Sequence, residues 1–496
     1  MSWIDNNSGT DRLAPLPGLS RAGVVLVGLL ALLGCAAVGP DYVRPAVKVP
    51  EKWTGASSSG QTGDAGLLAQ WWKTLDDPVL SGLIGMAVDE NLDVKEARSR
   101  VREARYRRLQ SRAPLFPSLD ATASARKSAS KKQGEPGMAS ELYTAGFDAG
   151  WELDFFGGAR RSVEAYQADL EAGIEDLHDV MVTLLSEVAV NYIDLRTYQA
   201  RLAVARGNVA AQKETWDLLL ALSRSGMGDE LAVTQARYNL ESSRAKIPDL
   251  EVGLEAAVNR LAVLTGRPAG SLQSQLAEVR PIPRASIELA VGVPADVIRQ
   301  RPDIRRAERE LAAQTARIGE AEAERYPKFT LNGSIGLEAL SFGDLFSSAN
   351  RTWSIGPSFS WPVIDGGAVR NNINIQTERR QQALIRYNAA ILSALEEVEN
   401  ALVTYAKEQQ KLGLLQNAAD AARSAAELAG YRYATGMIGF SDVLDAQRSL
   451  LSFEDQVAQS RGAVLSDLVR LYKALGGGWQ SIGTAGAPNP SQIGKG

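Results

Sequence analysis

Cys35 and His178 are the only cysteine and the only histidine in this chain of 496 residues. A single thiol cannot form a disulfide within the chain, and one thiol with one imidazole is too few ligands for a zinc site. The remaining candidates for catalysis are carboxylates such as Asp442 and Asp445. Their spacing fits one face of a helix better than a hydrolase pair. The sequence therefore predicts neither an enzyme nor a metal site, and we expect His178 to be a solvated helix residue.

The composition is that of a folded protein without a basic excess. Apolar residues make up 45% of the chain and charged residues 23%, and 58 acidic against 54 basic residues leave a formal charge of -4. A protein that binds nucleic acid normally carries a positive face, which this balance does not favour. We expect a chain with two or three buried cores and no nucleic-acid partner.

The segment around Cys35 has the layout of a lipoprotein signal. Arg21 is followed by Ala22–Leu33, in which every residue is apolar or glycine, and then by Gly34 and Cys35. The segment is too short for a transmembrane helix and is typical of a secretory signal peptide with a lipobox. We expect cleavage after residue 34, a covalent lipid on Cys35 and no other cofactor; the alternative is an unmodified cysteine after an ordinary signal. Ala36 permits sorting of a lipoprotein to the outer membrane.

Landmarks recur along the chain at a constant offset of 210 residues. This offset brings Trp151 onto Trp361, Glu187 onto Glu397 and the glycines at 226 and 266 onto those at 436 and 476. The chain is therefore predicted to be internally duplicated. The expected divisions are a signal peptide at 1–34, an N-terminal anchor and extension at 35–79, repeat 1 at 80–266, a connector at 267–293, repeat 2 at 294–476 and a C-terminal tail at 477–496.

Each repeat contains two segments in which apolar and polar residues alternate strictly. The segments are 119–126 and 143–155 in repeat 1, and 329–337 and 353–361 in repeat 2. Such alternation predicts a hairpin of two strands in each repeat, and the lengths suit tilted membrane strands with aromatic residues at the interfaces. The alternation by itself also allows a half-buried sheet of a soluble protein.

Long helical segments follow each hairpin of strands. Residues 160–225 contain no proline and only two glycines, and 369–429 contain no proline and one glycine. Each segment ends at a glycine-marked turn, after which a second helix returns toward Gly266 or Gly476. A purely helical scaffold would leave the alternating segments unexplained.

Four strands cannot form a stable sheet in a bilayer unless other subunits close it. The N–H and C=O groups at open edges would meet hydrocarbon, at a cost of several kcal/mol each. Three copies give twelve strands, which is enough for a barrel with a lumen. The predicted fold is thus an α+β membrane protein that forms a trimeric, twelve-stranded β-barrel.

The chain resembles the TolC-like outer-membrane efflux factors, and most closely the lipoproteins of the OprM/NodT branch. The stretches that carry the resemblance are Val38–Tyr42, Trp151–Gly157, Arg301–Ile304 with Ala307 and Glu308, Asp442–Arg448, and Leu471–Trp479. The resemblance implies a homotrimer whose barrel continues into a long periplasmic α-helical barrel with a mixed equatorial collar. It also implies an exit duct for drugs or other small toxic compounds, served by a periplasmic adaptor and a proton-driven inner-membrane pump. The alternatives are a duct for protein secretion and a lipoprotein scaffold without a pore.

The resemblance also suggests two functional sites at the helical turns. The tips formed by Gly226, Met227, Gly436 and Met437 correspond to the surfaces that meet the adaptor, and exposed methionine beside glycine suits an adaptable contact.

Tyr433, Asp442 and Asp445 match the periplasmic gate of the family, where like charges from three subunits would converge. Asp442 could instead be an early-helix acid behind Ser441 as N-cap. Two positions depart from the family pattern, because Ala232 stands where an aspartate can occur and Ile438 where an arginine can occur.

Overall fold

The computed structural model describes residues 37–46, 49–54, 68–130, 138–283 and 294–480. They form two compact units. The sheet unit comprises the chain up to Tyr42, Arg108–Tyr166 and Ala313–Arg380, and the helical unit comprises Val43–Arg107, Gln167–Ala312 and the chain from Gln381 onward. The predicted signal peptide and its Cys35 lie outside the described residues.

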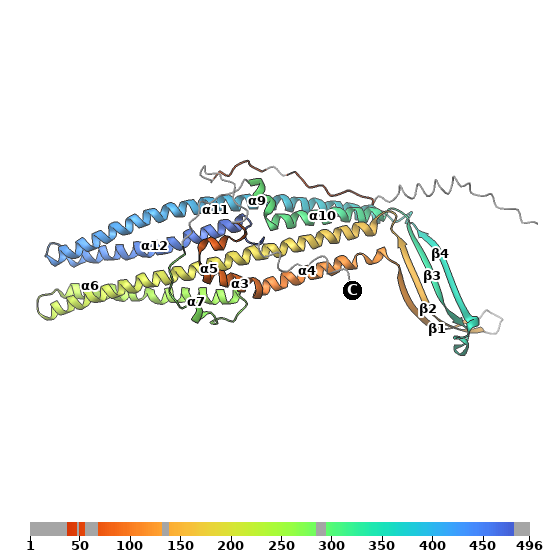
Figure 1. Ribbon diagram of the computed structural model, residues 1–496, viewed down its shortest axis with the longest axis horizontal. Helices are drawn as coiled ribbons and strands as arrows, with labels where there is room; N and C mark the ends of the chain where they lie inside the picture. Colours follow the sequence, from red (N-terminus) through yellow and green to blue (C-terminus); the bar gives the residue numbers. More distant parts are fainter. Residues whose placement is uncertain (1–36, 47–48, 55–67, 131–137, 284–293, 481–496) are drawn as a thin grey trace, which may run out of the picture. The chain divides into compact units, whose positions relative to one another are not determined.

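The sheet unit contains one antiparallel sheet with the strand order β1-β2-β3-β4 (Figure 1). The strands are β1 (Ser118–Ser130), β2 (Met138–Leu153), β3 (Lys328–Ala339) and β4 (Arg351–Ser360). Each repeat supplies one hairpin, as the alternation predicted, and β2 pairs with β3 to join the two repeats. Within the described residues β1 and β4 each have one unpaired edge.

The register keeps the apolar residues of all four strands on one face. Phe147 lies opposite Ile335, which in turn lies opposite Trp353, and the exposed fractions of these side chains are 52%, 65% and 76%. A shift of one residue in any pairing would move the apolar side chains of one strand to the opposite face of the sheet. The expectation of a half-buried soluble sheet is therefore wrong for the described residues, since most of the apolar face lies open and Phe342 packs on it only at Tyr143, with a centroid distance of 5.7 Å.

The opposite face of the sheet is polar and is linked across the strands by side-chain hydrogen bonds. Thr122 donates to Asp148 at 2.8 Å, Ser124 and Thr144 share a bond of 2.9 Å, and Ser334 and Ser354 share one of 2.8 Å. Such cross-strand pairs stabilise a register by roughly 0.2–1 kcal/mol each. The sheet thus has one face suited to hydrocarbon and one suited to water.

Ten helices and four short 3₁₀ helices are present in the described residues. The helices are α3 (Pro78–Glu90), α4 (Leu92–Gln110), α5 (Gly158–Arg224), α6 (Glu230–Arg244), α7 (Lys246–Leu264), α8 (Gln273–Leu276), α9 (Pro294–Gln300), α10 (Pro302–Ala323), α11 (Ala368–Ala434) and α12 (Phe440–Ala474). The 3₁₀ helices are η1 (Trp71–Leu75), η2 (Ala113–Leu115), η3 (Phe342–Asp344) and η4 (Ser348–Asn350). The long helices α5 and α11 have 67 residues each, about 100 Å at 1.5 Å per residue.

The returning helix differs between the two repeats. In repeat 2 it is the single helix α12 of 35 residues, whereas in repeat 1 it is divided into α6 and α7 at Ala245. Pro248 explains the division, because it has no N–H for a helical hydrogen bond and is accommodated best in the first turn of a helix. The prediction of one returning helix is therefore confirmed in repeat 2 and wrong in repeat 1.

Both long helices end in the same glycine-dependent turn. Gly226 and Gly436 both have φ of +75°. After the first glycine, the backbone N–H of Met227 donates to the carbonyl of Leu222 at 3.0 Å. After the second, that of Met437 donates to the carbonyl of Arg432 at 2.9 Å. This pattern is a Schellman motif, which needs a residue with positive φ. The same turn ends α7 at Gly266 and α12 at Gly476, so the duplication extends to the helix ends.

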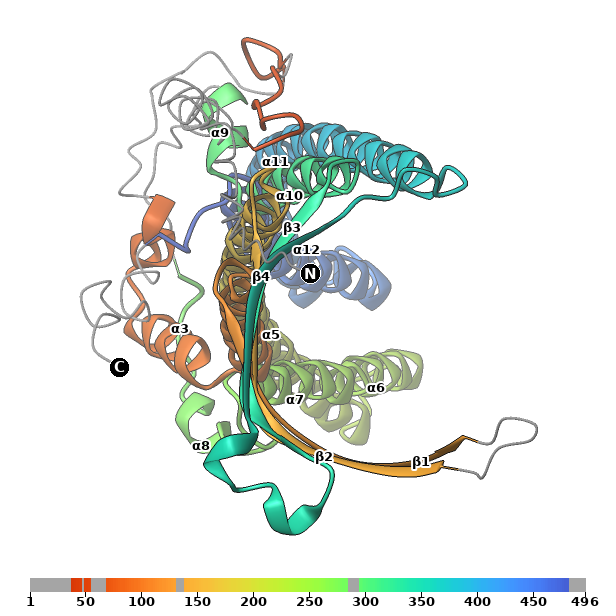
Figure 2. The same ribbon diagram turned by 90° about the vertical axis from the view of Figure 1, so that its right-hand side faces the viewer.

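A hydrophobic core in the helical unit joins α3 to the long helices. Trp71 of η1 stacks on Tyr472 of α12 at a centroid distance of 5.4 Å, and Leu80 and Leu83 of α3 are fully buried. The hydroxyl of Tyr192 on α5 donates to Asp77, the N-cap of α3. Burial and this bond raise the pKa of Tyr192 to about 12. Figure 2 shows α3 and α8 on the opposite side of α5 from α12 and α6.

Replacing Gly266 by alanine should reduce folding stability more than replacing Gly226 by alanine. Either alanine would carry backbone strain of about 1–2 kcal/mol, because both glycines have positive φ. At Gly266 the added Cβ would also overlap the carbonyl oxygen of Glu90, whereas nothing lies within 4 Å at Gly226. Circular dichroism during heating should give the lower Tm for Gly266→Ala. Equal Tm values would contradict this account of the two turns.

Candidate functional site

The two predicted docking tips are open to solvent in the helical unit. Met227 is 75% exposed and Met437 is 69% exposed. A Cβ placed on Gly226 or on Gly436 would meet no atom within 4 Å. The four residues therefore present accessible backbone and flexible apolar side chains to a partner.

A small apolar cluster lies just behind the tips. Leu219 of α5 and Ala232 and Ala236 of α6 pack with Phe440, Val443 and Leu444 of α12. The ring of Tyr433, at the end of α11, lies 5.4 Å from that of Phe440. This cluster holds the ends of the two helical hairpins together.

The same cluster gives a physical reason for the two departures from the family pattern. Ala232 is 3% exposed and packs inside the cluster, and Ile438 packs against it. An aspartate at 232 or an arginine at 438 would place a charge in this apolar contact, which costs free energy unless the charge is paired. Here both positions contribute to packing instead.

Asp442 and Asp445 lie on the exposed side of α12, whereas Val443 and Leu444 between them are buried. Helix α12 begins at Phe440 with Gly439 as N-cap and no side-chain cap. The expectation of Ser441 as N-cap is therefore wrong, because the helix starts one residue before it. Asp442 does lie in the first turn, where a carboxylate is favoured by the helix dipole.

The structure places Arg448 beside the predicted gate residues. Its guanidinium lies 3.6 Å from the carboxylate of Asp445, which is 77% exposed, and donates to the side chain of Asn239 at 3.0 Å. It also donates to the hydroxyl of Tyr238, whose ring lies 5.2 Å below it. Arg448 therefore links α12 to α6. Its spacing of three residues from Asp445 indicates an ion pair within α12, but nothing in the sequence indicates the contact with α6. Tyr433 makes no hydrogen bond to either aspartate within the described residues.

Several buried polar atoms around this seam between α5, α6 and α12 have no hydrogen-bond partner. They are Gln212 Oε1, Trp216 Nε1, Asn239 Nδ2 and Gln447 Oε1. Each unsatisfied buried group costs about 1–3 kcal/mol. Near the tips the seam therefore contains incompletely satisfied polar groups, whereas farther from them Arg201 of α5 donates two hydrogen bonds to Asp455 of α12, at 2.8 and 3.0 Å.

Arg301, the first residue of the Arg-Pro-Asp-Ile stretch, caps the C-terminal end of α12. Its guanidinium donates to the carbonyl of Ala474 and pairs with Asp303 at 2.8 Å and Glu397 at 2.7 Å. Burial lowers the pKa of Arg301, but the bonds to Asp303 and Glu397 raise it by more. In repeat 1 the amide of Asn91 donates to the carbonyl of Leu264 in the same way, at 2.9 Å.

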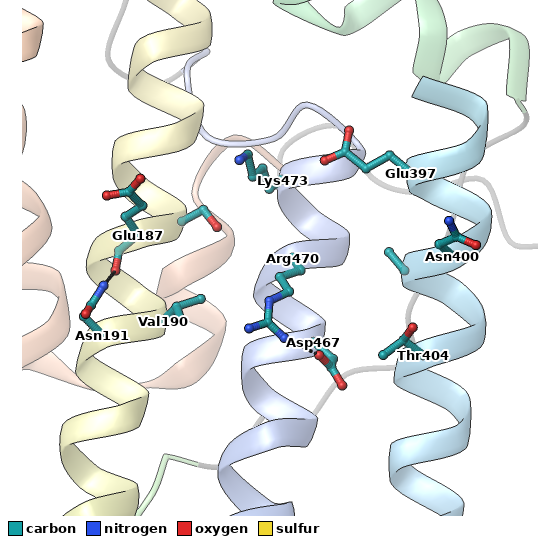
Figure 3. Close-up of a pocket in the computed structure, with 11 residues that line it drawn as sticks. Glu187, Val190, Asn191, Glu397, Asn400, Thr404, Asp467, Arg470 and Lys473 are labelled. Carbon is teal, nitrogen blue, oxygen red and sulfur yellow. Dashed lines mark hydrogen bonds and ion pairs between the residues drawn. The ribbon is translucent and has the colours of Figure 1, made fainter. Parts of the chain in front are cut away.

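A groove of about 610 Å³ lies between α5, α11 and α12 in the helical unit. Figure 3 shows Glu187 and Asn191 on α5, Asp467 and Arg470 on α12 and Glu397 on α11. Arg470 pairs with Asp467 at 2.7 Å, and burial raises the pKa of that aspartate. The groove carries charges of both signs, as expected of a surface in contact with water.

His178 differs from its sequence-based expectation. Its ring stacks on that of Trp479 at 4.3 Å, its Nδ1 lies 3.1 Å from Glu175, and its side chain is 13% exposed. The prediction of a solvated histidine is wrong because Trp479, far away in the sequence, covers the imidazole. The contact fastens the end of the described chain to α5.

Arg161 binds the described residues that lie nearest to Cys35 in the sequence. Its guanidinium donates to the carbonyls of Val38 and Gly39 at 3.0 and 3.2 Å and to the carboxylate of Asp41 at 2.7 Å. The amide of Val38 donates to the carbonyl of Phe156 at 3.0 Å. The segment therefore docks beside the end of β2, two residues after Cys35, which itself is not described.

No group of three or more His, Cys, Asp or Glu residues in the described ranges could hold a metal ion. No helix in the described part of the chain combines the length and the apolar content needed to cross a membrane.

Comparison with known proteins decides the family. The protein-family model described as outer membrane efflux protein matches residues 83–267 and 293–477. The chain belongs to the outer membrane efflux protein family. The matched ranges correspond to two copies of one unit, in agreement with the predicted duplication.

Individual relatives match over nearly the full length. The chain is 32% identical over 469 residues to nodulation protein T of Rhizobium leguminosarum bv. trifolii, covering 92% of this chain and 97% of that protein. It is 31% identical over 472 residues to the pyoverdine export outer membrane protein OpmQ of Pseudomonas aeruginosa, covering 93% and 98%. The solved structure of the outer-membrane channel OprN is 38% identical with a TM-score of 0.84, covering 89% of this chain and 99% of that one.

The predicted family, fold class, efflux function and outer-membrane location are thereby confirmed. This outer membrane efflux protein is a channel component with an internally duplicated α+β fold and a periplasmic helical extension. These relatives are named as export, nodulation and channel proteins rather than as enzymes. The positions predicted for docking and gating remain predictions.

Proposed function

We propose that three copies of this chain close a twelve-stranded barrel and form the passive exit duct of a tripartite small-molecule efflux system. The observation that carries the proposal is the sheet, whose apolar face is exposed while β1 and β4 each have an unpaired edge in the described residues. Pairing β4 of one copy with β1 of the next would satisfy every edge.

The inner-membrane pump would supply the energy, and a periplasmic adaptor would connect the pump to the helical tips. The sequence contains no nucleotide-binding loop, so this chain contributes a path rather than a driving force. The names of two relatives support a small-molecule substrate: OpmQ is a pyoverdine export protein, and TtgI of Pseudomonas putida, 30% identical over 466 residues, is a toluene efflux pump protein. Drugs or other small toxic compounds are the substrate class that we propose.

We also propose that Cys35 carries the lipid anchor. A relative from Salmonella typhimurium, 28% identical over 456 residues, is named a probable outer membrane lipoprotein. The bonds from Arg161 to the segment behind Cys35 would hold such an anchor beside the end of the sheet.

Replacing Cys35 by alanine should abolish labelling with radioactive palmitate and leave unprocessed precursor. Ala36→Asp is the control, because the acceptor thiol remains while an aspartate after the cysteine favours retention at the inner membrane. It should keep the label and shift the protein to the inner-membrane fraction. Palmitate labelling that survives Cys35→Ala would exclude this anchor.

Gly436→Trp should block export without dissociating the trimer, because a bulky side chain at the tip would obstruct binding of the adaptor. Drug susceptibility of a deletion strain carrying each variant measures export. Gly413→Trp is the control, since Gly413 is also open to solvent but lies within α11, away from the tip. Met437→Gln tests the apolar contact without backbone strain and should reduce export. Normal resistance with both tip variants would contradict the docking role.

Asp445→Ala combined with Asp442→Ala should raise single-channel conductance in planar bilayers and increase leakage of large antibiotics. The exposed carboxylates of three subunits would otherwise face one another at the constriction and bind cations there. Asp420→Ala is the control, because its side chain is 75% exposed, close to the 77% of Asp445, but lies on α11. Wild-type conductance in the double variant, with block by divalent cations unchanged, would place the constriction elsewhere.

A further inference from the structure

The loop between β3 and β4 exposes three large apolar side chains. Leu340 is 72% exposed, Phe342 64% and Phe346 75%. All three belong to the sheet unit. An exposed group of large apolar side chains usually marks a surface that contacts a partner or a membrane. We call Leu340, Phe342 and Phe346 the apolar loop residues.

Hydrogen bonds within the loop hold its shape. The hydroxyl of Ser341 donates to the carboxylate of Asp344 at 2.7 Å, and the side-chain amide of Asn350 donates to the carbonyl of Asp344 at 2.8 Å. Leu345 is only 5% exposed, so the loop also buries one apolar side chain of its own. The exposure of the apolar loop residues is therefore a property of a folded loop.

The loop lies against the apolar face of the sheet. The ring of Phe342 packs edge to face on that of Tyr143, with a centroid distance of 5.7 Å. Tyr143 shares its face with Phe147, because alternate side chains of a strand point to the same side. Figure 2 shows the loop, in teal between β3 and β4, on the convex side of the curved sheet. The apolar loop residues therefore extend the apolar face.

An ion pair marks where the apolar face of β2 ends. Glu141 lies on the same face as Tyr143 and accepts hydrogen bonds from the Tyr143 hydroxyl at 3.1 Å and from Lys127 at 2.6 Å. Charged side chains are costly in hydrocarbon, and aromatic residues border the apolar band of a membrane barrel. This pair therefore indicates the level of the lipid headgroups, and Tyr143 with Phe342 lies just inside it.

The length of β3 gives the same level independently. From Phe329 to Ala339 the strand rises about 25 Å along the membrane normal, at about 3.3 Å per residue and a tilt of about 40°. The apolar band of a membrane barrel is also about 25 Å tall. Ala339 pairs with Tyr143, so the loop begins at the edge of the band.

The segment that joins β1 to β2 has a different composition. Residues 131–137 include Lys131, Lys132 and Glu135 and no large apolar residue. A hairpin of this sheet therefore does not require apolar residues between its strands. Those between β3 and β4 serve something that this hairpin alone meets.

We propose that the apolar loop residues insert among the acyl chains of the outer leaflet and fasten this loop to the membrane. The proposal rests on the barrel proposed above. Helix α10 precedes β3 and α11 follows β4, so the loop lies at the end of the hairpin away from the periplasmic helices. A loop fastened to lipid stays on the outside of the barrel and leaves the mouth of the duct open.

A second copy of the chain is a less suitable occupant. In the proposed barrel, β4 pairs with β1 of the next copy. On its apolar face, the end of β1 near the loop carries Ala125, Lys127 and Ala129. These side chains offer little apolar surface to two phenylalanines and a leucine, whereas acyl chains cover any exposed apolar surface beside the barrel.

Nitroxide labels on introduced cysteines show whether the loop lies in lipid or in water. Leu340→Cys and Phe346→Cys are made separately in the full-length chain, labelled and reconstituted in phosphatidylcholine vesicles. Unsubstituted protein treated in the same way corrects for label on Cys35. Electron spin resonance measures collisions with oxygen, which concentrates among acyl chains, and with a nickel chelate, which stays in water. Both labels should collide more often with oxygen.

Two positions in the same hairpin provide the reference values. Ile335, which is 65% exposed on the apolar face of β3, gives the value for lipid. Thr352 is exposed and shares the polar face of β4 with Ser354, so it gives the value for water. The ratio of oxygen to chelate collisions at Leu340 and Phe346 should match that of Ile335→Cys and exceed that of Thr352→Cys.

Phe346→Ser should release the loop, with the label at position 340 as the reporter. Loss of one large apolar contact with lipid should increase the population of detached loop about tenfold or more. Chelate collisions at the label should rise accordingly. Phe346→Leu is the matched control and should leave the label in lipid. Because Phe346 is 75% exposed, neither substitution removes a buried contact of the fold.

The proposal fails if the loop labels collide mainly with the chelate, which would place the loop in water or over the pore. Shielding from both reagents would show that it packs against another copy and would also overturn the proposal, as would an unchanged label in Phe346→Ser. Chelate collisions at Ile335 would overturn the barrel itself. Oxygen collisions there, with chelate collisions at Phe346, would overturn only the insertion of the loop.

Discussion

The pairing of backbone N–H and C=O groups is the constraint on which the rest of this structure depends. A strand that faces hydrocarbon on one side can satisfy these groups only through neighbouring strands. The four strands of one chain do this internally at three interfaces and leave two edges, on β1 and β4. The register is fixed by the same requirement, because only one pairing keeps Phe147, Ile335 and Trp353 on a common face. Closure by further copies follows from the chemistry of the edges.

The two repeats share one fold, and the positions at which they differ indicate where each repeat is specialised. The glycine turns at 226 and 436 are the same in φ and in hydrogen bonding. The cap on the returning helix is conserved in position but not in chemistry, since Asn91 serves in repeat 1 and the ion-paired Arg301 in repeat 2. At the tips, Ala232 packs in the core where its counterpart Asp442 faces solvent. At this pair of equivalent positions the carboxylate is therefore present in repeat 2 alone.

Buried charges in the helical unit are compensated, whereas the contacts near the tips are fewer. Arg301 has two carboxylates and a helix end as partners. The seam between α5, α6 and α12 is bridged by Arg448 and by the Arg201–Asp455 pair, and it leaves several buried polar atoms unsatisfied. Loss of either carboxylate would leave the buried charge of Arg301 less compensated, so the network around Arg301 resists change.

The sequence by itself determined the duplication, the four alternating strands, the two long helices and their glycine turns, because each depends on local rules of backbone conformation and on residue spacing. The resemblance to a known family also indicated Tyr433, Asp442 and Asp445. The tertiary structure decided which distant residues meet. Trp479 covers His178, Arg448 reaches Tyr238 and Asn239, and Arg161 holds the segment behind Cys35. No local pattern predicts these contacts, because their partners lie up to about three hundred residues apart and come together only when the helices pack.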